Sequence, residues 1–140
     1  MMPLDPKQLA HQVVILSNLH AARQVEECIL RETEVFGYSA ECAFAIRLAL
    51  EEAVVNAHKH GNQCDPGKHI TVSYEVHPNR VIVRVRDEGK GFDPENIPDP
   101  TSPERIALPN GRGIMLMRAY LDDVAFNEHG NEVQLVKERS

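Results

Sequence analysis

The 140-residue sequence lacks several features that would mark a specialised class of protein. It has no tryptophan and only 5% aromatic residues, so its core must be mostly aliphatic. Its 15 lysines and arginines are outnumbered by 21 aspartates and glutamates, and the net charge of −6 excludes a general nucleic-acid binder with a basic face. It also has no run of about 18 apolar residues, the length that indicates a membrane span. Its 42% hydrophobic and 26% charged residues are typical of one globular domain, which we expect over residues 1–140.

The cysteines are few, and CxxC spacing is absent. Their odd number and wide spacing predict reduced thiols, and they are Cys28, Cys42 and Cys64. The first residues show no basic region followed by an apolar run, so we expect a cytoplasmic protein without a secretory signal. A zinc site is an alternative because His58, His60 and Cys64 are close in sequence, although helical ligands are usually three or four residues apart and a fourth ligand is not evident.

The hydrophobic pattern predicts the order strand, helix, helix, strand, strand, long loop, helix, strand, strand. Ser17 and Ser39 are the expected N-caps of the first two helices, and Gly61 is the expected left-handed residue that ends the second helix. The expected ranges are 12–16, 17–37, 39–60, 70–76, 80–86, 114–121, 124–127 and 132–136. This order predicts an α+β fold, a two-layer sandwich with helices on one face of a mixed, mostly antiparallel sheet.

A first motif lies on the second predicted helix, with the sequence LEEAVVNAHKHG. Glu52, Asn56 and His60 are spaced by four residues, which places them on one helix face. A carboxylate and an amide oxygen one turn apart suit a hydrated magnesium ion, and the carboxylate is alternatively a general base. Taken alone, this pattern is also that of a solvated helix face.

A second motif, RDEGKGF, follows the predicted strand 80–86. Asp87 closes this strand, where its carboxylate can accept a hydrogen bond from an exocyclic amine. Gly89 and Gly91 allow a sharp turn and the approach of a flat ring. An ordinary turn at a strand end has the same composition.

A third motif, NGRGI, is expected to open the third helix. Free backbone amides at a helix start, with glycines that allow close approach, form an anion site suited to phosphate. It follows a long loop from Asp87 to Gly113 that contains five of the nine prolines, and loops of this length are usually lids or disordered links.

Together and in this order, the three motifs resemble the GHKL (histidine-kinase-like) ATP-binding fold, also called the Bergerat fold. Gyrases, sensor histidine kinases and bacterial anti-sigma serine kinases share it. The resemblance runs from about Val13 to Val136, and LEEAVVNA with His60 and Gly61 is its most specific piece. The N-terminal strand and helix and the single-domain length resemble the anti-sigma factor kinases of partner-switching systems.

The resemblance implies a role for each motif. Glu52 would be the general base that takes the proton from a serine hydroxyl of a protein substrate. Asn56 would hold the magnesium ion, and Asp87 would bind the adenine amino group. The residues implied in nucleotide binding are Asn56, His60, Asp87, Gly89, Gly91, Gly111, Arg112 and Gly113.

The implied function is that of a cytoplasmic serine kinase that uses ATP and Mg²⁺ to phosphorylate a STAS-type anti-anti-sigma protein. It would also sequester a sigma factor, and a homodimer is the implied assembly, without direct contact with nucleic acid or membrane. An alternative of another class is a non-catalytic, nucleotide-gated binding module whose lid switches a partner surface. A kinase core fragment and a structural α+β protein with coincidental motifs are further alternatives.

The sequence departs from the family pattern in two places. The last hairpin of the family usually carries a Gly-Thr pair whose hydroxyl supports adenine through water. Gly130-Asn131-Glu132 stands there instead, so this contact is missing or is replaced by Asn131. The lid from Asp93 to Asn110 is rich in proline, and its Arg105 either reaches a terminal phosphate or is solvated.

Overall fold

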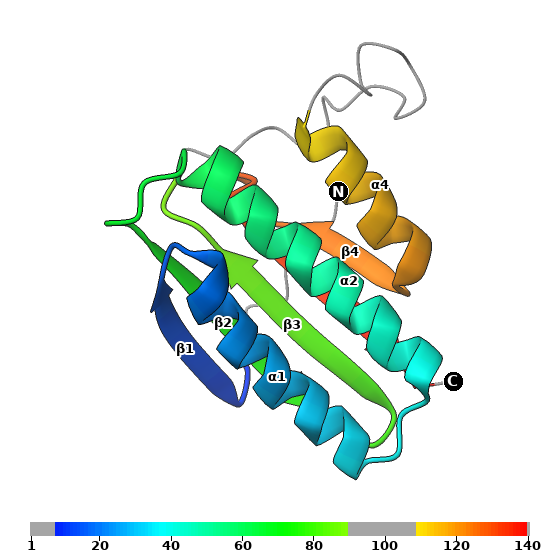
Figure 1. Ribbon diagram of the computed structural model, residues 1–140. Helices are drawn as coiled ribbons and strands as arrows, with labels where there is room; N and C mark the ends of the chain where they lie inside the picture. Colours follow the sequence, from blue (N-terminus) through cyan, green and yellow to red (C-terminus); the bar gives the residue numbers. More distant parts are fainter. Residues whose placement is uncertain (1–7, 90–108, 140) are drawn as a thin grey trace.

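An antiparallel sheet is covered on one face by helices in the computed structural model, which describes residues 8–89 and 109–139 (Figure 1). Its elements are β1 (His11–Leu16), α1 (Leu19–Val35), α2 (Ala40–Asn56), a π-helical turn η1 (Ala57–Gly61), β2 (His69–Val76), β3 (Arg80–Arg86), α4 (Pro109–Tyr120), β4 (Asp123–Phe126) and β5 (Glu132–Glu138). Helices α1 and α2 lie side by side, and α4 packs against the other side of α2. The predicted α+β class and element order are confirmed.

The five strands have the order β1-β2-β3-β5-β4, and all four pairings among the described residues are antiparallel. In the β2–β3 hairpin, Val72 pairs with Val85 and Tyr74 pairs with Val83. These side chains are buried, as the alternation of the two strands predicts. The apolar face of the sheet therefore meets the helices and forms the core. The largest wholly buried apolar side chains are Ile29, Leu50, Ile70, Met117, Val72 and Val81.

The predicted N-cap residue is correct for α2 and wrong for α1. Ser39 caps α2, because its hydroxyl accepts a hydrogen bond from the backbone N–H of Cys42 at 3.1 Å. For α1 the prediction of Ser17 as the cap is wrong, since Asn18 Oδ1 accepts from the N–H of Ala21 at 2.7 Å. Both residue types make good N-caps, and Ser17 is instead wholly buried, with its hydroxyl in a polar network.

The end of α2 also differs from the prediction. The α-helix ends at Asn56 and continues as the π-helical turn η1, whereas the pattern predicts an α-helix to His60. Gly61 is not left-handed, and the residues with positive φ after the turn are Gln63 at 52° and Cys64 at 59°. Single π-helical turns in proteins are often found at functional sites.

The C-terminal elements begin earlier or extend further than predicted. Helix α4 begins at Pro109 rather than at residue 114, and proline suits the first position of a helix. Strand β5 continues to Glu138 rather than ending at 136. Gly91, Arg105 and most of the predicted lid lie outside the described residues.

A buried carboxylate lies between α1 and α2. Glu26 of α1 is 2% exposed, and its Oε1 lies 3.0 Å from Nη1 of Arg47 on α2. Burial raises the pKa of Glu26 to about 7, and the nearby charge of Glu51 adds to this rise, while Arg47 opposes it. Its burial therefore gives the helical layer a group that titrates near neutral pH.

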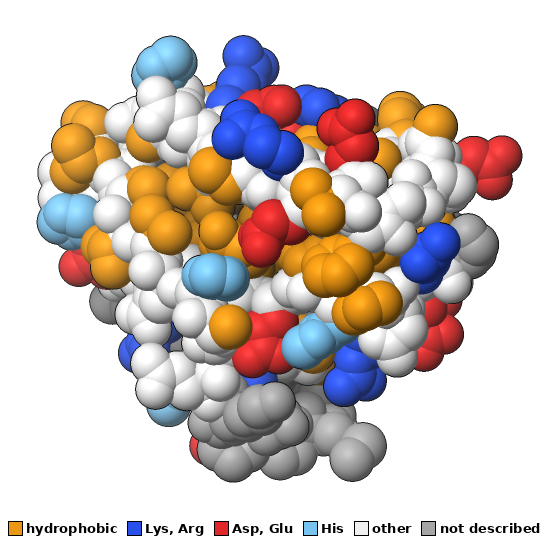
Figure 2. Space-filling model, turned by 90° about the horizontal axis from the view of Figure 1, so that it is seen from below, with side chains coloured by type: hydrophobic (Ala, Val, Ile, Leu, Met, Phe, Trp, Pro, Cys, Tyr) orange, Lys and Arg blue, Asp and Glu red, His pale blue; other side chains and the backbone are white. Residues whose placement is uncertain are grey.

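Most exposed hydrophobic side chains belong to β1 and the three helices. The large ones are Val13, Val14, Leu16, Leu19, Val35, Phe44, Met115 and Tyr120. Figure 2 views the molecule from below and shows hydrophobic side chains that share this face with charged and histidine side chains. None of the helices in the described part of the chain is long and apolar enough to cross a membrane.

Candidate functional site

A cavity of about 570 Å³ opens where η1, the end of β3, the β4–β5 hairpin and α4 meet. This volume lies within the usual range of small-ligand sites. Its lining comes from these segments, from the end of α2 and from the loop before β2: Ala53, Asn56, Ala57, His60, Gly61, Gln63, Lys68, Val85, Asp87, Glu88, Gly89, Met117, Phe126, Gly130, Asn131, Glu132 and Val133. The structure thus brings Asn56 and His60 of the first motif and Asp87 and Gly89 of the second to one cavity.

Asp87 is the half-buried carboxylate of this cavity. Its backbone N–H donates to the carbonyl of Asn131 on the neighbouring hairpin at 2.9 Å. Its Oδ1 accepts a hydrogen bond from the N–H of Gly89 at 2.7 Å. Burial raises the pKa of Asp87, and the Gly89 N–H and the charge of Lys68 oppose this rise. Asp87 is therefore a fixed hydrogen-bond acceptor facing a partly dry pocket.

Two glycines allow the backbone to approach Asp87. A Cβ at Gly61 would overlap the Asp87 carboxylate, and a Cβ at Gly89 would overlap the carbonyl oxygen of Gly61. Residue 61 is therefore glycine because of this close approach and not because of a left-handed backbone. Gly61, Asp87 and Gly89 therefore pack directly against one another, and all three line the cavity.

Glu52 and Asn56 lie one turn apart on α2, and Gly113 of α4 packs against both. A Cβ at Gly113 would lie 2.8 Å from Nδ2 of Asn56 and 3.2 Å from Oε2 of Glu52. The carboxylate and the amide therefore lie side by side against the backbone of α4 at Gly113. Carboxylate and amide oxygens are ligands that Mg²⁺ accepts along with its waters, so this donor set fits the ion.

The third motif occupies a different place in its helix from the one expected. Because α4 begins at Pro109, Asn110 and Gly111 lie in its first turn, where backbone amides have no partner within the helix. Arg112 and Gly113 follow that turn. Their backbone amides therefore lie within the helix and not at its start, where the sequence motif predicts them. Gly113 is the residue of this motif that makes the close contact with Glu52 and Asn56.

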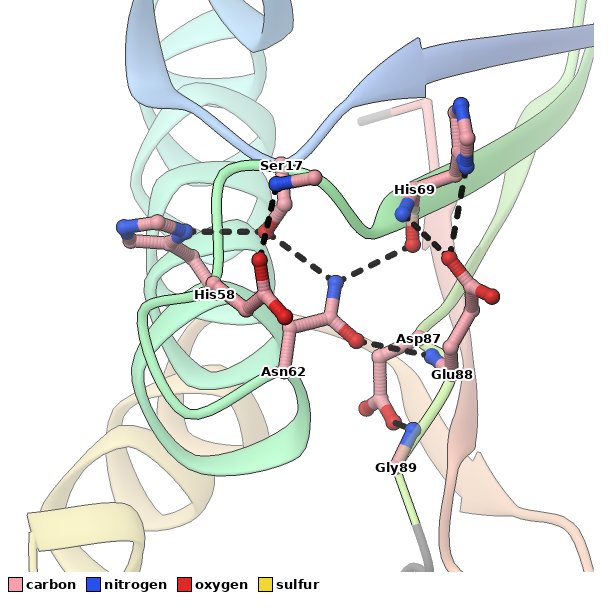
Figure 3. Close-up of polar contacts among 9 residues, drawn as sticks. Ser17, His58, Asn62, His69, Asp87, Glu88 and Gly89 are labelled. Atoms are coloured by element: carbon pink, nitrogen blue, oxygen red, sulfur yellow. Dashed lines mark hydrogen bonds and ion pairs between the residues drawn. The ribbon is translucent and has the colours of Figure 1, made fainter.

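The structure adds a buried polar network that sequence reasoning missed (Figure 3). Asn62 is wholly buried directly after η1, and its Nδ2 donates to Ser17 Oγ and to the His69 carbonyl, both at 3.0 Å. Its Oδ1 accepts from the N–H of Glu88 at 2.8 Å. Ser17 Oγ also pairs with Nδ1 of His58 at 2.8 Å. An asparagine next to a glycine after a helix reads as a loop residue, so the sequence gives no signal of this burial.

Two alternatives from the sequence, a zinc site at the histidines and an adenine contact by Asn131, gain no support from the geometry. In residues 8–89 and 109–139, no group of three or more His, Cys, Asp or Glu side chains is placed to hold a metal ion, so zinc at His58, His60 and Cys64 finds no such cluster. In the hairpin, Asn131 Oδ1 accepts from Nδ2 of Asn127 at 2.6 Å. The side-chain oxygen of Asn131 is thus committed within the hairpin, although the residue lines the cavity.

Comparison with known proteins matches residues 15–137 to the family described as histidine kinase-like ATPase domain. The serine-protein kinase RsbW of Listeria innocua is 29% identical over 108 residues, which cover 72% of this chain and 69% of that protein. The anti-sigma F factor of Anoxybacillus flavithermus is 31% identical over 99 residues, 66% of each chain. The crystal structure of the RsbU and RsbW domains of Rv1364c from Mycobacterium tuberculosis shares the fold, with a TM-score of 0.57 and 21% identity. That match covers 93% of this chain and 32% of the other.

Proposed function

The chain belongs to the histidine kinase-like ATPase domain family, and on this premise we propose that it is an ATP-dependent protein-serine kinase that also acts as an anti-sigma factor. Relatives named serine-protein kinase and anti-sigma F factor support this proposal. The observation that carries it is the single cavity lined by Asp87 and Asn56, with Glu52 beside Asn56 at the contact with Gly113. The phosphate acceptor would be a STAS-type anti-anti-sigma protein in the cytoplasm, and the sequestered partner a sigma factor.

Asp87 would recognise the adenine base. Its carboxylate accepts a hydrogen bond from the Gly89 N–H, and its backbone N–H donates to the Asn131 carbonyl. Little conformational freedom is therefore lost at Asp87 when the base binds. The flat ring would lie in the cavity that Gly61 and Gly89 line beside Asp87. An acceptor at this position favours a base that presents an exocyclic amine to it over a base that presents a carbonyl oxygen there. The carbonyl oxygen would leave two acceptors facing each other.

Glu52 and Asn56 would form the reacting end. Asn56 would hold Mg²⁺, and the bound metal nucleotide supplies charge neutralisation and the phosphoryl group. The Glu52 carboxylate, half-buried and next to Asn56, would take the proton of the acceptor serine hydroxyl. His60 and the first turn of α4, which includes Gly111, would line the part of the site that holds the phosphates.

The proposal is tested by measuring nucleotide binding and phosphoryl transfer separately. ATP is titrated with and without Mg²⁺ into the parent protein, Asp87→Asn and Glu52→Ala, and transfer to a purified STAS-type partner is followed. We expect Asp87→Asn to lose at least about tenfold in ATP affinity. We expect Glu52→Ala to bind ATP like the parent and to lose roughly 10²- to 10⁴-fold in transfer. Glu41→Ala, an exposed carboxylate at the far end of α2, is the matched control.

Each outcome decides one part of the proposal. Transfer by Glu52→Ala at the parental rate would show that Glu52 is not the base. ATP binding without transfer to any tested partner would favour the nucleotide-gated binding module over the kinase. Failure of the parent protein to bind ATP at millimolar concentration would overturn both.

A further inference from the structure

Asn62 connects three separate segments next to the cavity. It lies wholly buried at the end of η1 and bonds to Ser17 after β1, to His69 at the start of β2 and to Glu88 after β3 (Figure 3). Its orientation is fixed by chemistry, because the Glu88 N–H can only donate and the His69 carbonyl can only accept. The oxygen of the Asn62 side chain must therefore face Glu88.

The backbone is thus held by a hydrogen bond on each side of the Asp87 α-carbon. On one side, the Asp87 N–H donates to the Asn131 carbonyl at 2.9 Å. On the other side, the Glu88 N–H donates to Asn62 Oδ1 at 2.8 Å. Asn62 also directly follows Gly61, whose backbone approaches the Asp87 carboxylate more closely than any side chain would allow. One side chain therefore fixes both the strand end that carries Asp87 and the turn that faces it.

We propose that Asn62 is a positioning residue for base recognition, which sets the Asp87 carboxylate against the exocyclic amine of adenine by holding the Glu88 N–H. This inference rests on the proposed nucleotide site and adds to it the residue that determines its selectivity. Loss of the Asn62 oxygen would leave the Glu88 N–H without its protein partner and free the Asp87–Glu88 peptide to rotate. A carboxylate that rotates accepts less well from the amine and discriminates less between adenine and guanine.

The test compares nucleotide selectivity with stability. Dissociation constants for ATP and GTP are measured with the full chain as parent, Asn62→Ala and Asn62→Ser, together with inorganic tripolyphosphate and a thermal melt. Ser17→Ala is the matched control, because it removes a hydrogen bond from the same buried network but leaves the Asn62–Glu88 bond in place. Serine at position 62 is a milder second variant, whose shorter hydroxyl keeps a polar group in the buried space.

We expect the preference for ATP over GTP to fall about tenfold in Asn62→Ala and less in Asn62→Ser. Ser17→Ala should lower the melting temperature but keep the parental preference, and tripolyphosphate affinity should stay the same in all folded variants. The proposal would be wrong if Asn62→Ser kept the parental ratio of ATP to GTP affinity, or if Ser17→Ala lost as much of that ratio as the Asn62 variants. Asn62 would then have a structural role only. If the parent protein does not bind ATP, the proposed function itself is wrong. If the parent binds ATP and the variants keep its selectivity, only the role of Asn62 is wrong.

Discussion

The two ends of the cavity are built in different ways. At the Asp87 end, the N–H groups of Asp87 and Glu88 donate to Asn131 and Asn62, and the Gly89 N–H donates to Asp87. These bonds connect the strand end with the hairpin and with the residue that follows the π-helical turn. At the Glu52 end, two helices meet at one close contact, where Gly113 packs against Glu52 and Asn56. The end proposed to recognise the base is therefore determined by hydrogen bonds to the backbone, whereas the end proposed to react depends on how closely α4 approaches α2. The two ends should respond differently to small changes in volume and in pH.

The largest effect is expected from adding one methyl group at the Asp87 end. In Gly61→Ala the new Cβ would overlap the Asp87 carboxylate, and the network around Asn62 leaves neither segment free to move away. We expect ATP affinity to fall by about 100-fold or more, measured by calorimetric titration, because the acceptor is displaced. Gly67→Ala is the matched control, since its Cβ would meet only the side-chain oxygen of Asp65 at 3.2 Å in an exposed turn. Parental affinity in Gly61→Ala would contradict a rigid Asp87 end.

A smaller and different effect is expected at the other end. In Gly113→Ala the new Cβ would lie 2.8 Å from Asn56 Nδ2, so the Asn56 side chain or α4 must move. Alanine favours a helix over glycine by about 0.5–1 kcal/mol, which offsets part of the cost to stability. We expect roughly tenfold slower phosphoryl transfer and a weaker dependence of ATP binding on Mg²⁺, with the ATP-to-GTP ratio unchanged. A changed ratio with normal transfer would show that the two ends are not separable.

The sequence predicts the two ends unequally well. Strict alternation in β2 and β3 predicts their pairing and hence the position of Asp87 at the strand end. The spacing of Glu52 and Asn56 predicts their common helix face, which the contact with Gly113 confirms. The burial of Asn62 and of Ser17 is not predictable from local pattern, because both residue types favour caps and loops and only tertiary partners decide their place. The start of α4 is missed for a related reason, since Pro109 suits a helix start as well as a loop.

The smallest of these effects concerns pH. Because burial raises the pKa of Asp87, this carboxylate protonates at a higher pH than an exposed aspartate. A protonated Asp87 is a poorer acceptor for the adenine amine, so acidification from pH 8 to pH 5.5 should weaken ATP binding a few-fold more in the parent than in Asp87→Asn. Protonation of the triphosphate affects both proteins equally, so the difference between their titrations isolates Asp87.

Unfolding at low pH would not explain weaker ATP binding in acid, because the buried carboxylate of Glu26 makes the folded protein more stable as the pH falls. The pKa of Glu26 is about 7 in the folded protein and lies above its ordinary value of 4.5. The folded state therefore holds this proton more tightly than the unfolded state, and the resulting stability is present at low pH and lost as the pH rises through 7. Thermal melts should show the parent gaining stability over the range in which its ATP affinity falls, and Glu26→Gln should flatten that gain without altering the affinity change. Parallel loss of melting temperature and affinity on acidification would show that Asp87 is not the group being titrated.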